Sequence, residues 1–596
     1  MQGNCLIVLN REECCDMIGI FALITKKDIR VADAVIKDIV IDNNCELIFD
    51  YVKNENVVVV HNILNKFQND QILYADDHIT LVLDGVILNT QQLMSRYKVN
   101  NLKQLFISCI NNDSIEELLP KLRGSFCGLI GIGTEMYVFT DQLATKQLFY
   151  TFNDDALIVS SEVNAIVQYF QKKEIAYSLD EVGAYSLLSY AYMYMDHTLI
   201  KEIKRLKEGT ILHYNGKKID FYEYYKFPNK EIHINRNDAI ERIDDLFLNS
   251  VKLQIDKNRE YGYCDVIPLS AGMDCRMTSF AARRLTNTSL LNFTYSEFGQ
   301  EDCKTPGLMA RELGNRWLFK NLDNGLDMFN IQESIDIADG LIYYLWPAQL
   351  NDVLKLLNTT NWGIVHTGVI GDVILGSWHN RKDGSYTLGD GAYSSKLINK
   401  LDEYLSENEK NTEINYELGM FKNRAINGAC MGYSTTFRHY CIDLSPFMNI
   451  DFLNFCLSLP FDYRKNHSIY YEWVKKKYPS AAKFKHNGVT IKGELSVNYK
   501  GRKIRIRAIK DLIVRKAQAL QRDMFHKDFG MNPQESWLAS NKDLHFEMVQ
   551  YFNANKECLM VWPEIYQDAC QLFENGSAIE KSLAISVSGS VKRFFG

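Results

Sequence analysis

The segment from Asp265 to Arg276 carries the residue types that bind a phosphate group. An apolar run, Val266 to Leu269, is followed by small residues and Asp274, and a helical pattern begins at Met277. Backbone N–H groups in a small-residue loop at a helix N-terminus can close on a phosphate, and the helix dipole favours the anion. The hydroxyl of Ser270 can add a hydrogen bond, and Asp274 can hold Mg²⁺. The same spacing also fits an ordinary turn between a strand and a helix, so this loop alone leaves both interpretations open.

The elements that must position this loop follow a regular alternation from about residue 237. Asn237 and Asp238 are good N-cap residues for the helix that opens it. Strands are predicted at 266–269, 289–294, 317–319 and 363–367, and helices at 277–285, 302–313 and 344–357. This alternation predicts βαβ units and an α/β doubly wound parallel sheet, in which ligands bind beyond the carboxyl ends of the strands. Ser270 and Gly368 both lie where a predicted strand ends.

Residues 17–225 show a different pattern, in which short apolar or alternating runs are separated by turn residues. Such runs lie at 18–25, 57–61, 79–83, 128–133, 136–140, 147–152 and 156–160, and a helical pattern lies at 90–96. This pattern predicts a layered α+β domain. The polar segment 226–237 reads as a linker, and residues 491–596 are expected to form a helical extension that packs on the core.

Composition sets limits on the partners. The chain has 596 residues, which suggests two to four domains, and a net charge of −7, which argues against nucleic acid as a partner. We find no apolar run of ~18 residues, so no membrane span is expected, and residues 1–16 read as an N-terminal extension without a convincing signal peptide. The 14 cysteines include no C-x-x-C pair. We therefore expect a cytoplasmic protein with reduced cysteines and no zinc site.

Motifs in both parts of the chain, in the same order, resemble the asparagine synthetase family. In the first part the similar segments are 122–130, 141–150, 161–162 and 198–210. In the second part they are 270–276, 302–314, 367–372 and 443–449. The segment 270–276 resembles the pyrophosphate-binding loop Ser-Gly-Gly-x-Asp-Ser, with alanine and cysteine at two positions. The segment 367–372 resembles the Ser-Gly-x-Gly-x-Asp loop of the same family.

The resemblance implies two domains, together with ATP and Mg²⁺. Residues 17–225 would form a class II glutamine amidotransferase-like domain with an N-terminal-nucleophile αββα sandwich, and residues 237–490 an ATP-pyrophosphatase domain. Asp274 and Asp372 would be catalytic residues and magnesium ligands, and Lys485 a catalytic lysine, with Lys483 as the alternative. The residues expected to bind ATP are Leu269, Ser270, Ala271, Gly272, Met273, Asp274, Cys275, Thr294 and Gly368.

The chain departs from the family at the glutaminase site. Ile18 stands where the nucleophilic cysteine belongs, and an aliphatic side chain cannot attack an amide. Asp84 replaces an asparagine that donates to the oxyanion, and Val86 replaces a glutamate that binds the amine of glutamine. We therefore predict that the first domain is retained as structure and has no glutaminase activity.

The resulting hypothesis is an ATP-dependent, AMP-forming ligase that joins a carboxylate to ammonia or an amine. The carboxylate could belong to a small molecule, a sugar acid or a peptide. Arg276 is weak support for a uronic-acid-like carboxylate, and Val369 argues against plain aspartate amidation. An ammonia-supplying protein or a homo-oligomer are further possible partners. Two alternatives stay open: a catalytically inactive scaffold, favoured by the changes at Ala271, Cys275 and Val369, and a glutamine-hydrolysing asparagine synthetase.

Overall fold

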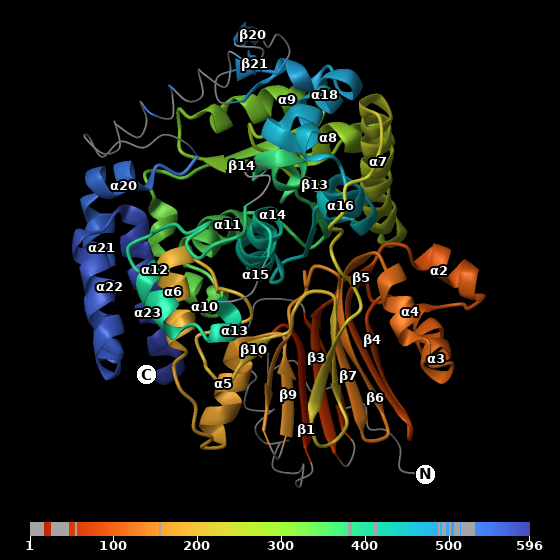
Figure 1. Ribbon diagram of the computed structural model, residues 1–596, viewed down its shortest axis with the longest axis vertical. Coiled ribbons are helices and arrows are strands. Elements are labelled where there is room, and N and C mark those ends of the chain that lie inside the picture. Colours follow the sequence, from red (N-terminus) through yellow and green to blue (C-terminus); the bar gives the residue numbers. More distant parts are fainter. Residues whose placement is uncertain are drawn as a thin grey trace.

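The computed structural model describes residues 17–25, 47–53, 56–153, 156–378, 384–410, 414–486, 489–491, 496–499, 502–505, 513, 516 and 531–596 (Figure 1). The expected N-terminal extension 1–16 lies outside these ranges. We call residues 17–225 the first half and residues 237–490 the second half.

Two antiparallel six-stranded sheets form the first half. One has the order β10 (Lys204–Arg205), β8 (Phe149–Phe152), β9 (Ala156–Ser160), β1 (Gly19–Thr25), β3 (Val57–Leu64) and β2 (Leu47–Lys53). The other has the order β12 (Ile219–Glu223), β11 (Thr210–Tyr214), β7 (Glu135–Thr140), β6 (Gly124–Ile132), β5 (Ile79–Ile87) and β4 (Ile72–Ala75). Figure 1 shows the two sheets as the lower layer of the molecule.

The alternation of side chains along each strand explains why these sheets stack. In β1, Ile20, Ala22 and Ile24 lie in an apolar cluster shared by both sheets, whereas Phe21 and Leu23 face the opposite side. That outer side is covered by α5 (Val163–Lys172) and α6 (Glu181–Tyr190), and the outer side of the second sheet by α2 (Thr90–Tyr97), α3 (Leu102–Asn111) and α4 (Ile115–Leu118). The result is an αββα sandwich, which confirms the predicted layered fold of this half.

A long helix, α7 (Arg236–Tyr261), opens the second half after a segment without regular structure. Its N-cap is Asn235, whose side chain accepts a hydrogen bond from the backbone of Asp238 at 2.9 Å. The expected cap at Asn237 and Asp238 is therefore wrong by two to three residues. Asn237 and Asp238 lie instead in the first turn of α7, because the side chain of Asn235 already accepts a hydrogen bond from a backbone N–H group of that turn.

The second half contains a five-stranded parallel sheet, as the alternation predicts. Its order is β15 (Arg316–Asn321), β14 (Leu291–Ser296), β13 (Cys264–Pro268), β16 (Trp362–His366) and β17 (Ile442–Leu444). The chain adds β14 and β15 on one side of β13 and then β16 and β17 on the other. The direction of winding therefore reverses between β13 and β16, and ligands bind at such a switch point in open parallel sheets.

Helices cover both faces of this sheet. They include α8 (Asp274–Leu285), α9 (Thr305–Leu313), α11 (Leu345–Lys355), α15 (Met431–Phe437), α16 (Ile450–Leu457), α17 (Phe461–Arg464) and α18 (Ser468–Lys477). Helix α10 (Ile331–Ala338) packs instead in a cluster with residues of the first half. The helix expected at 302–313 begins at Thr305, because Pro306 fits only the first turn and residues 301–303 form a short 3₁₀ turn. Shorter helices are α12 (Ile398–Tyr404), α13 (Glu407–Lys410) and α14 (Tyr416–Met420), and a π-helical stretch spans Phe421–Cys430.

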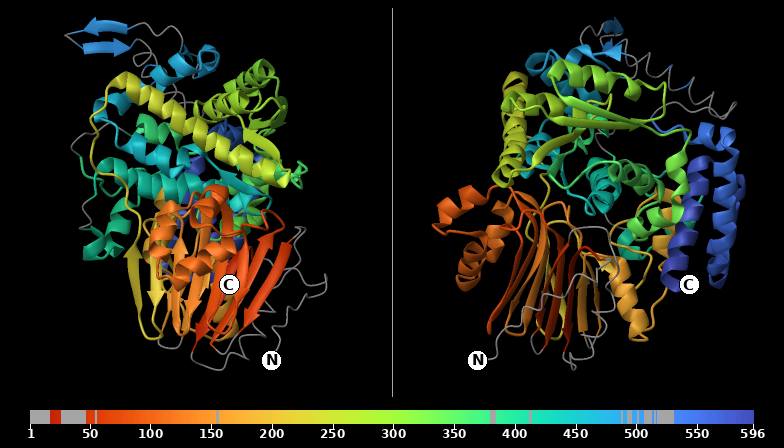
Figure 2. Two further views of the ribbon diagram at one scale, coloured as in Figure 1. Left: turned by 90° about the vertical axis from the view of Figure 1, so that its right-hand side faces the viewer. Right: turned by 180° about the vertical axis from the view of Figure 1, so that it is seen from behind.

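The C-terminal part is helical from residue 534. Helices α21 (Lys542–Asn555), α22 (Pro563–Asn575) and α23 (Ala578–Phe595) lie side by side along the molecule, and the short α20 (Gln534–Ser540) lies at one end of them (Figures 1 and 2). Two small hairpins precede them: β18 (Lys485–His486) with β19 (Val489–Thr490), and β20 (Ser496–Tyr499) with β21 (Arg502–Arg505). The expectation of helices throughout 491–596 is wrong at β20 and β21, where Val497 lies opposite Ile504 in antiparallel register.

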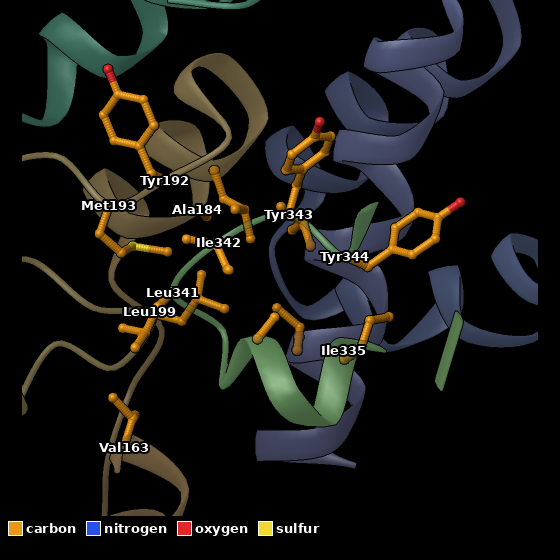
Figure 3. Close-up of a cluster of buried hydrophobic side chains, with 14 of the residues drawn as sticks. Val163, Ala184, Tyr192, Met193, Leu199, Ile335, Leu341, Ile342, Tyr343 and Tyr344 are labelled. Atoms are coloured by element: carbon orange, nitrogen blue, oxygen red, sulfur yellow. The ribbon is translucent and has the colours of Figure 1, made fainter. Parts of the chain in front are cut away.

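The two halves share one hydrophobic core. Met193 of the first half donates its backbone N–H to Leu341 at 3.2 Å, and Tyr343 donates to Ala191 at 3.0 Å. Side chains of both segments lie in one buried cluster that also includes α23 (Figure 3). Buried side chains of the first half therefore pack directly against those of the second half. Within the described part of the chain, we find no helix with the length and apolar character that crossing a membrane requires.

Candidate functional site

The loop between β13 and α8 is held by its own polar groups. The hydroxyl of Ser270 accepts a hydrogen bond from the backbone of Gly272 at 3.1 Å. The backbone N–H of Ala271 donates to a carboxylate oxygen of Asp302 at 2.7 Å, and burial raises the pKa of Asp302. Helix α8 begins at Asp274, immediately after the loop. The geometry is the strand, short loop and helix that an anion site requires.

A second loop, from Thr367 to Asp372 after β16, packs directly on the first. A Cβ atom added at Gly368 would lie 2.3 Å from the backbone nitrogen of Cys275, and one added at Gly371 would lie 2.7 Å from Cγ of Asp274. The backbone N–H of Asp372 donates to Oδ2 of Asp274 at 2.9 Å. The two loops that the sequence singled out therefore meet at the switch point, where only glycine permits their close approach.

Asp274 lies at the centre of this contact. Its Oδ1 accepts a hydrogen bond from the hydroxyl of Tyr470 at 2.7 Å. Burial, with the nearby charge of Asp372 as the second cause, raises the pKa of Asp274 well above its ordinary value. No group of three or more metal-ligating side chains occurs in the described ranges. Two neighbouring carboxylates nevertheless fit Mg²⁺, which takes one or two protein carboxylates and completes its shell with water and phosphate oxygens.

The other residues expected to bind ATP are placed around these loops. Leu269 and Met273 are buried in the core cluster under α8. Thr294 donates its hydroxyl to the carbonyl of Leu269 at 2.6 Å and accepts a bond from the indole of Trp317 at 2.9 Å. In this structure the hydroxyl of Thr294 therefore fixes the start of the loop. Cys275 is half-buried, and burial raises the pKa of its thiol to about 12.

Arg276 is part of the framework of this site. Its guanidinium donates to the backbone carbonyls of Ala271 at 2.7 Å, Ala481 at 3.1 Å, Phe484 at 3.1 Å and Lys485 at 2.8 Å. The side chain is fully buried. These carbonyls take up the Nη donors of Arg276, so its guanidinium has a structural role here, and its use as support for a uronic-acid carboxylate stays a prediction.

Arg276 also holds the segment that contains Lys483 and Lys485 against the loop after β13. The side chains of Lys483 and Lys485 are exposed, but the backbone from Ala481 to Lys485 is tied to the loop after β13 through Arg276. The structure therefore brings the Lys485 segment to the same edge of the sheet as Asp274. No contact joins the Lys485 side chain to either carboxylate within the described residues.

Sequence reasoning missed Tyr470. It lies in α18, 196 positions from Asp274, and a tyrosine at a buried position of a helix gives no signal of a polar role at a distant site. The sequence does point to Asp302, because this residue stands in one of the motif segments. It does not show that the carboxylate of Asp302 binds the backbone of the loop after β13.

The site expected for a glutaminase contains Ile18 and a rearranged set of polar groups. The backbone N–H of Ile18 donates to Oε1 of Glu162 at 3.0 Å. Glu162 also forms an ion pair with Arg438 of the second half at 3.1 Å. Burial raises the pKa of Glu162 to about 7. Asp84 pairs with Lys146 at 2.7 Å, so its carboxylate is bound to a cation.

Val86, at the position of the amine-binding glutamate, is fully buried. It lies in an apolar cluster with Phe67, Ile364, Ile442 and Leu444, four residues drawn from both halves. Its side chain therefore contributes to the interface between the halves, and it has no polar atom to offer a ligand.

Comparison with known families finds one match, in the first half. Residues 51–225 match the model of a family described as a glutamine amidotransferase domain. This part of the chain is similar to glutamine amidotransferase domains. The matched segment begins after Ile18, so it does not include the position of the missing nucleophile. No curated protein matches the chain.

Two solved structures are similar over about half of the chain. One is described as the structure of the allosteric regulatory enzyme of purine biosynthesis, with 12% identity over 51% of this chain and 75% of the other, and a TM-score of 0.23. The second is glutamine phosphoribosylpyrophosphate amidotransferase from B. subtilis complexed with ADP and GMP, with 12% identity over 52% and 86%, and a TM-score of 0.24. At these scores neither structure carries an argument about this chain.

Proposed function

We propose that this protein is an AMP-forming, ATP-dependent ligase of the asparagine synthetase type that makes an amide bond. The observation that carries the proposal is the contact between the loops after β13 and β16. It joins Asp274 to the backbone of Asp372 at the point where the parallel sheet reverses its winding. The second half would thus be an ATP-pyrophosphatase domain.

In this reaction a substrate carboxylate attacks the α-phosphorus of ATP, the bond to the β-phosphate breaks, and pyrophosphate leaves. An amine then attacks the acyl-adenylate, and AMP leaves. The loop from Leu269 to Cys275 would bind phosphate oxygens through its N–H groups. Asp274 and Asp372 would hold Mg²⁺, which neutralises charge on the departing pyrophosphate. The protein's own part is to orient the substrates and to exclude water from the adenylate.

The nitrogen would not come from glutamine hydrolysed by this chain. Ile18 offers no nucleophile, and the carboxylate of Asp84 is paired with Lys146. Free ammonia, ammonia from a partner protein or an amine on the substrate would replace it. Release of glutamate from glutamine by the pure protein would restore a glutamine-hydrolysing asparagine synthetase as the function.

The test is carboxylate-dependent exchange of labelled pyrophosphate into ATP, over a panel of amino acids, uronic acids and peptides. Asp274→Asn and Asp372→Asn should each abolish the exchange, while Ile18→Ala, as the matched change in the silent site, should leave it unchanged. Exchange that survives both aspartate changes would refute the assignment of these residues. ADP as the product would refute the reaction class.

A second candidate is a scaffold that binds a partner without turnover. The observation that favours it is the state of Asp274, whose two oxygens are engaged by Tyr470 and by the backbone of Asp372. Equilibrium dialysis with Mg-ATP separates the two candidates. A folded protein that binds no ATP would be the scaffold.

A further inference from the structure

A buried lysine and two carboxyl groups meet where the C-terminal end of α7 reaches the first half (Figure 1). Lys257 belongs to α7, Asp70 lies between β3 and β4, and the side chain of each is 1% exposed. The ammonium of Lys257 lies 3.1 Å from Oδ1 and 3.0 Å from Oδ2 of Asp70. The carboxylate of Glu260 lies 3.2 Å from the same ammonium. We call Lys257, Asp70 and Glu260 the lysine site.

The lysine site contains more acid than base and is set in apolar surroundings. With all three groups ionised it carries one excess negative charge. The ring of Tyr261 lies 5.5 Å from the ammonium and packs with Phe67 in the apolar cluster between the halves. Burial raises the pKa of the Asp70 carboxyl, although the charge of Lys257 acts in the other direction. The surroundings therefore favour the neutral carboxylic acid of Asp70 more than water does.

Two donors are directed at the carboxyl group of Asp70. The backbone N–H of Ile87 donates to Oδ2 at 2.9 Å, and the hydroxyl of Tyr261 donates to Oδ1 at 3.4 Å. A fixed backbone N–H on such an oxygen stabilises the negative charge that the oxygen takes up when a nucleophile attacks the carbon. The amine of a lysine is a nucleophile once it has lost its proton. The lysine site thus combines a nucleophile, an acid carbon and an oxyanion donor.

We propose that Lys257 and Asp70 condense to an intramolecular isopeptide bond, with Glu260 as the proton carrier. The lone pair of Nζ attacks Cγ of the protonated carboxyl, and the electron pair of the C=O bond moves to Oδ2, beside the N–H of Ile87. Glu260 takes a proton from Nζ and passes it to Oδ1, which leaves as water while the C=O bond re-forms. One C–N bond forms, one C–O bond breaks, and one water molecule is released, so no other reactant is needed.

Two features separate the lysine site from an ordinary ion pair. Contact in a rigid, buried setting replaces a chance encounter, and burial opposes the separated charges of the unreacted pair. The pair of Lys146 with Asp84 at 2.7 Å has neither feature in full, because the lysine is 22% exposed and no second carboxylate contacts it among the described residues. That pair is expected to stay ionic.

The bond would tie the first half to the second by a covalent link. The two residues are 187 positions apart, so the link closes a long loop and restricts the unfolded chain. The first half would then stay attached to the second even where it has no reaction of its own. The proposal does not depend on ATP binding or on turnover in the second half.

Peptide mass spectrometry of the full chain, denatured and digested with trypsin, tests the bond. An amide on Lys257 blocks cleavage after that residue, so residues 67–96 and 253–259 should appear as one branched peptide. This peptide should be lighter than the sum of its two parts by about 18 Da, the mass of one water. Cleavage after Lys146 should be complete, as the internal control. Recovery of residues 67–96 as an unbranched peptide in full yield would overturn the proposal.

Two variants test the roles of the residues. Lys257→Arg keeps the positive charge but has no amine, so the branched peptide should be absent, and its presence would overturn the assignment of Lys257. Glu260→Gln covers the case in which that variant does not fold, because Glu260 is 33% exposed and keeps its shape as glutamine. Without the proton carrier, the branched fraction in freshly made protein should fall at least about tenfold.

The matched control for Glu260→Gln is Asp256→Asn. Asp256 is a neighbouring acid of α7 that pairs with Lys252 and Arg259 and has no contact with Lys257 among the described residues. This variant should keep the full branched fraction. A branched fraction in Glu260→Gln equal to that of the unchanged protein, or a loss of the same size in Asp256→Asn, would overturn the role of Glu260 as proton carrier.

Discussion

Replacing Arg276 with methionine should release the segment 481–485 from the loop after β13. The guanidinium makes three of its four backbone bonds to that segment, at 3.1, 3.1 and 2.8 Å. Hydrogen bonds from a charged donor contribute about 1.5–3 kcal/mol each. Two of the three carbonyls are only partly buried and can turn to water. We therefore expect the free energy of local opening to fall by about 3 kcal/mol, which makes opening roughly a hundredfold more frequent.

Hydrogen–deuterium exchange measures this directly. The amides of Ala482, Lys483 and Phe484 donate to the carbonyls of Tyr478, Ser480 and Ala481, and they should exchange about a hundredfold faster in Arg276→Met. Local exchange is the suitable assay because it reports the opening of this segment alone. Strand β1 serves as the internal reference and should not change.

The matched control lies on the same helix. Arg283 also donates to backbone carbonyls, those of Leu313 at 2.8 Å and Thr286 at 2.6 Å, but it has no bond to the segment 481–485. Arg283→Met should leave exchange there unchanged. If Arg276→Met speeds exchange at these amides by less than about threefold, the reasoning that Arg276 holds the segment is refuted.

Three further predictions concern buried groups. Gly368→Ala should abolish Mg-ATP binding in equilibrium dialysis, because its Cβ would lie 2.3 Å from a backbone nitrogen of the facing loop; unchanged binding would show that the loops can separate. Tyr470→Phe removes a 2.7 Å bond to Asp274 and should slow pyrophosphate exchange about tenfold, and an unchanged rate would show that the bond does not position Asp274. Burial raises the pKa of Asp327 from 3.8 to about 7, so the stability that its proton provides is complete below pH 3.8 and is lost as the pH rises to about 7. Asp327→Asn should flatten the dependence of the unfolding midpoint on pH in that window, and an unchanged slope would contradict this cause.

The parts of the site that the sequence predicts are local in the chain. An apolar run, small residues and an aspartate stand within twelve consecutive positions, and their spacing is enough to predict a strand, a loop and a helix around Ser270. The second loop could be predicted because a parallel sheet places the ends of its strands at one edge. Both loops are found at that edge, in contact through Asp274 and Asp372.

The parts that could not be predicted depend on contacts between distant residues. Nothing near Tyr470 or Arg276 in the sequence shows which carbonyl or carboxylate each will meet, because the partners are separated by 196 and up to 209 positions. A buried arginine and a solvent-facing arginine look alike in the sequence. The sequence could show that Ile18 is not a nucleophile, but it could not show that Glu162 and Arg438 cross the interface beside it.

The loop 367–372 raises the question of whether losing a motif glycine also loses the shape of the loop. Ile370 stands where the family motif has its second glycine, and its φ is +66°, a region that costs an ordinary side chain roughly 1–2 kcal/mol. The side chain is 4% exposed within the core cluster under α8, and burying an isoleucine contributes about 1.5–3 kcal/mol. The packing therefore offsets the strain. Apolar contacts hold Ile370 in the backbone conformation that usually makes glycine the preferred residue at such a position. The absence of that glycine is therefore no argument against a nucleotide site at this loop. A polar residue at the same position would be such an argument, because it would keep the backbone strain and lose the apolar burial that offsets it.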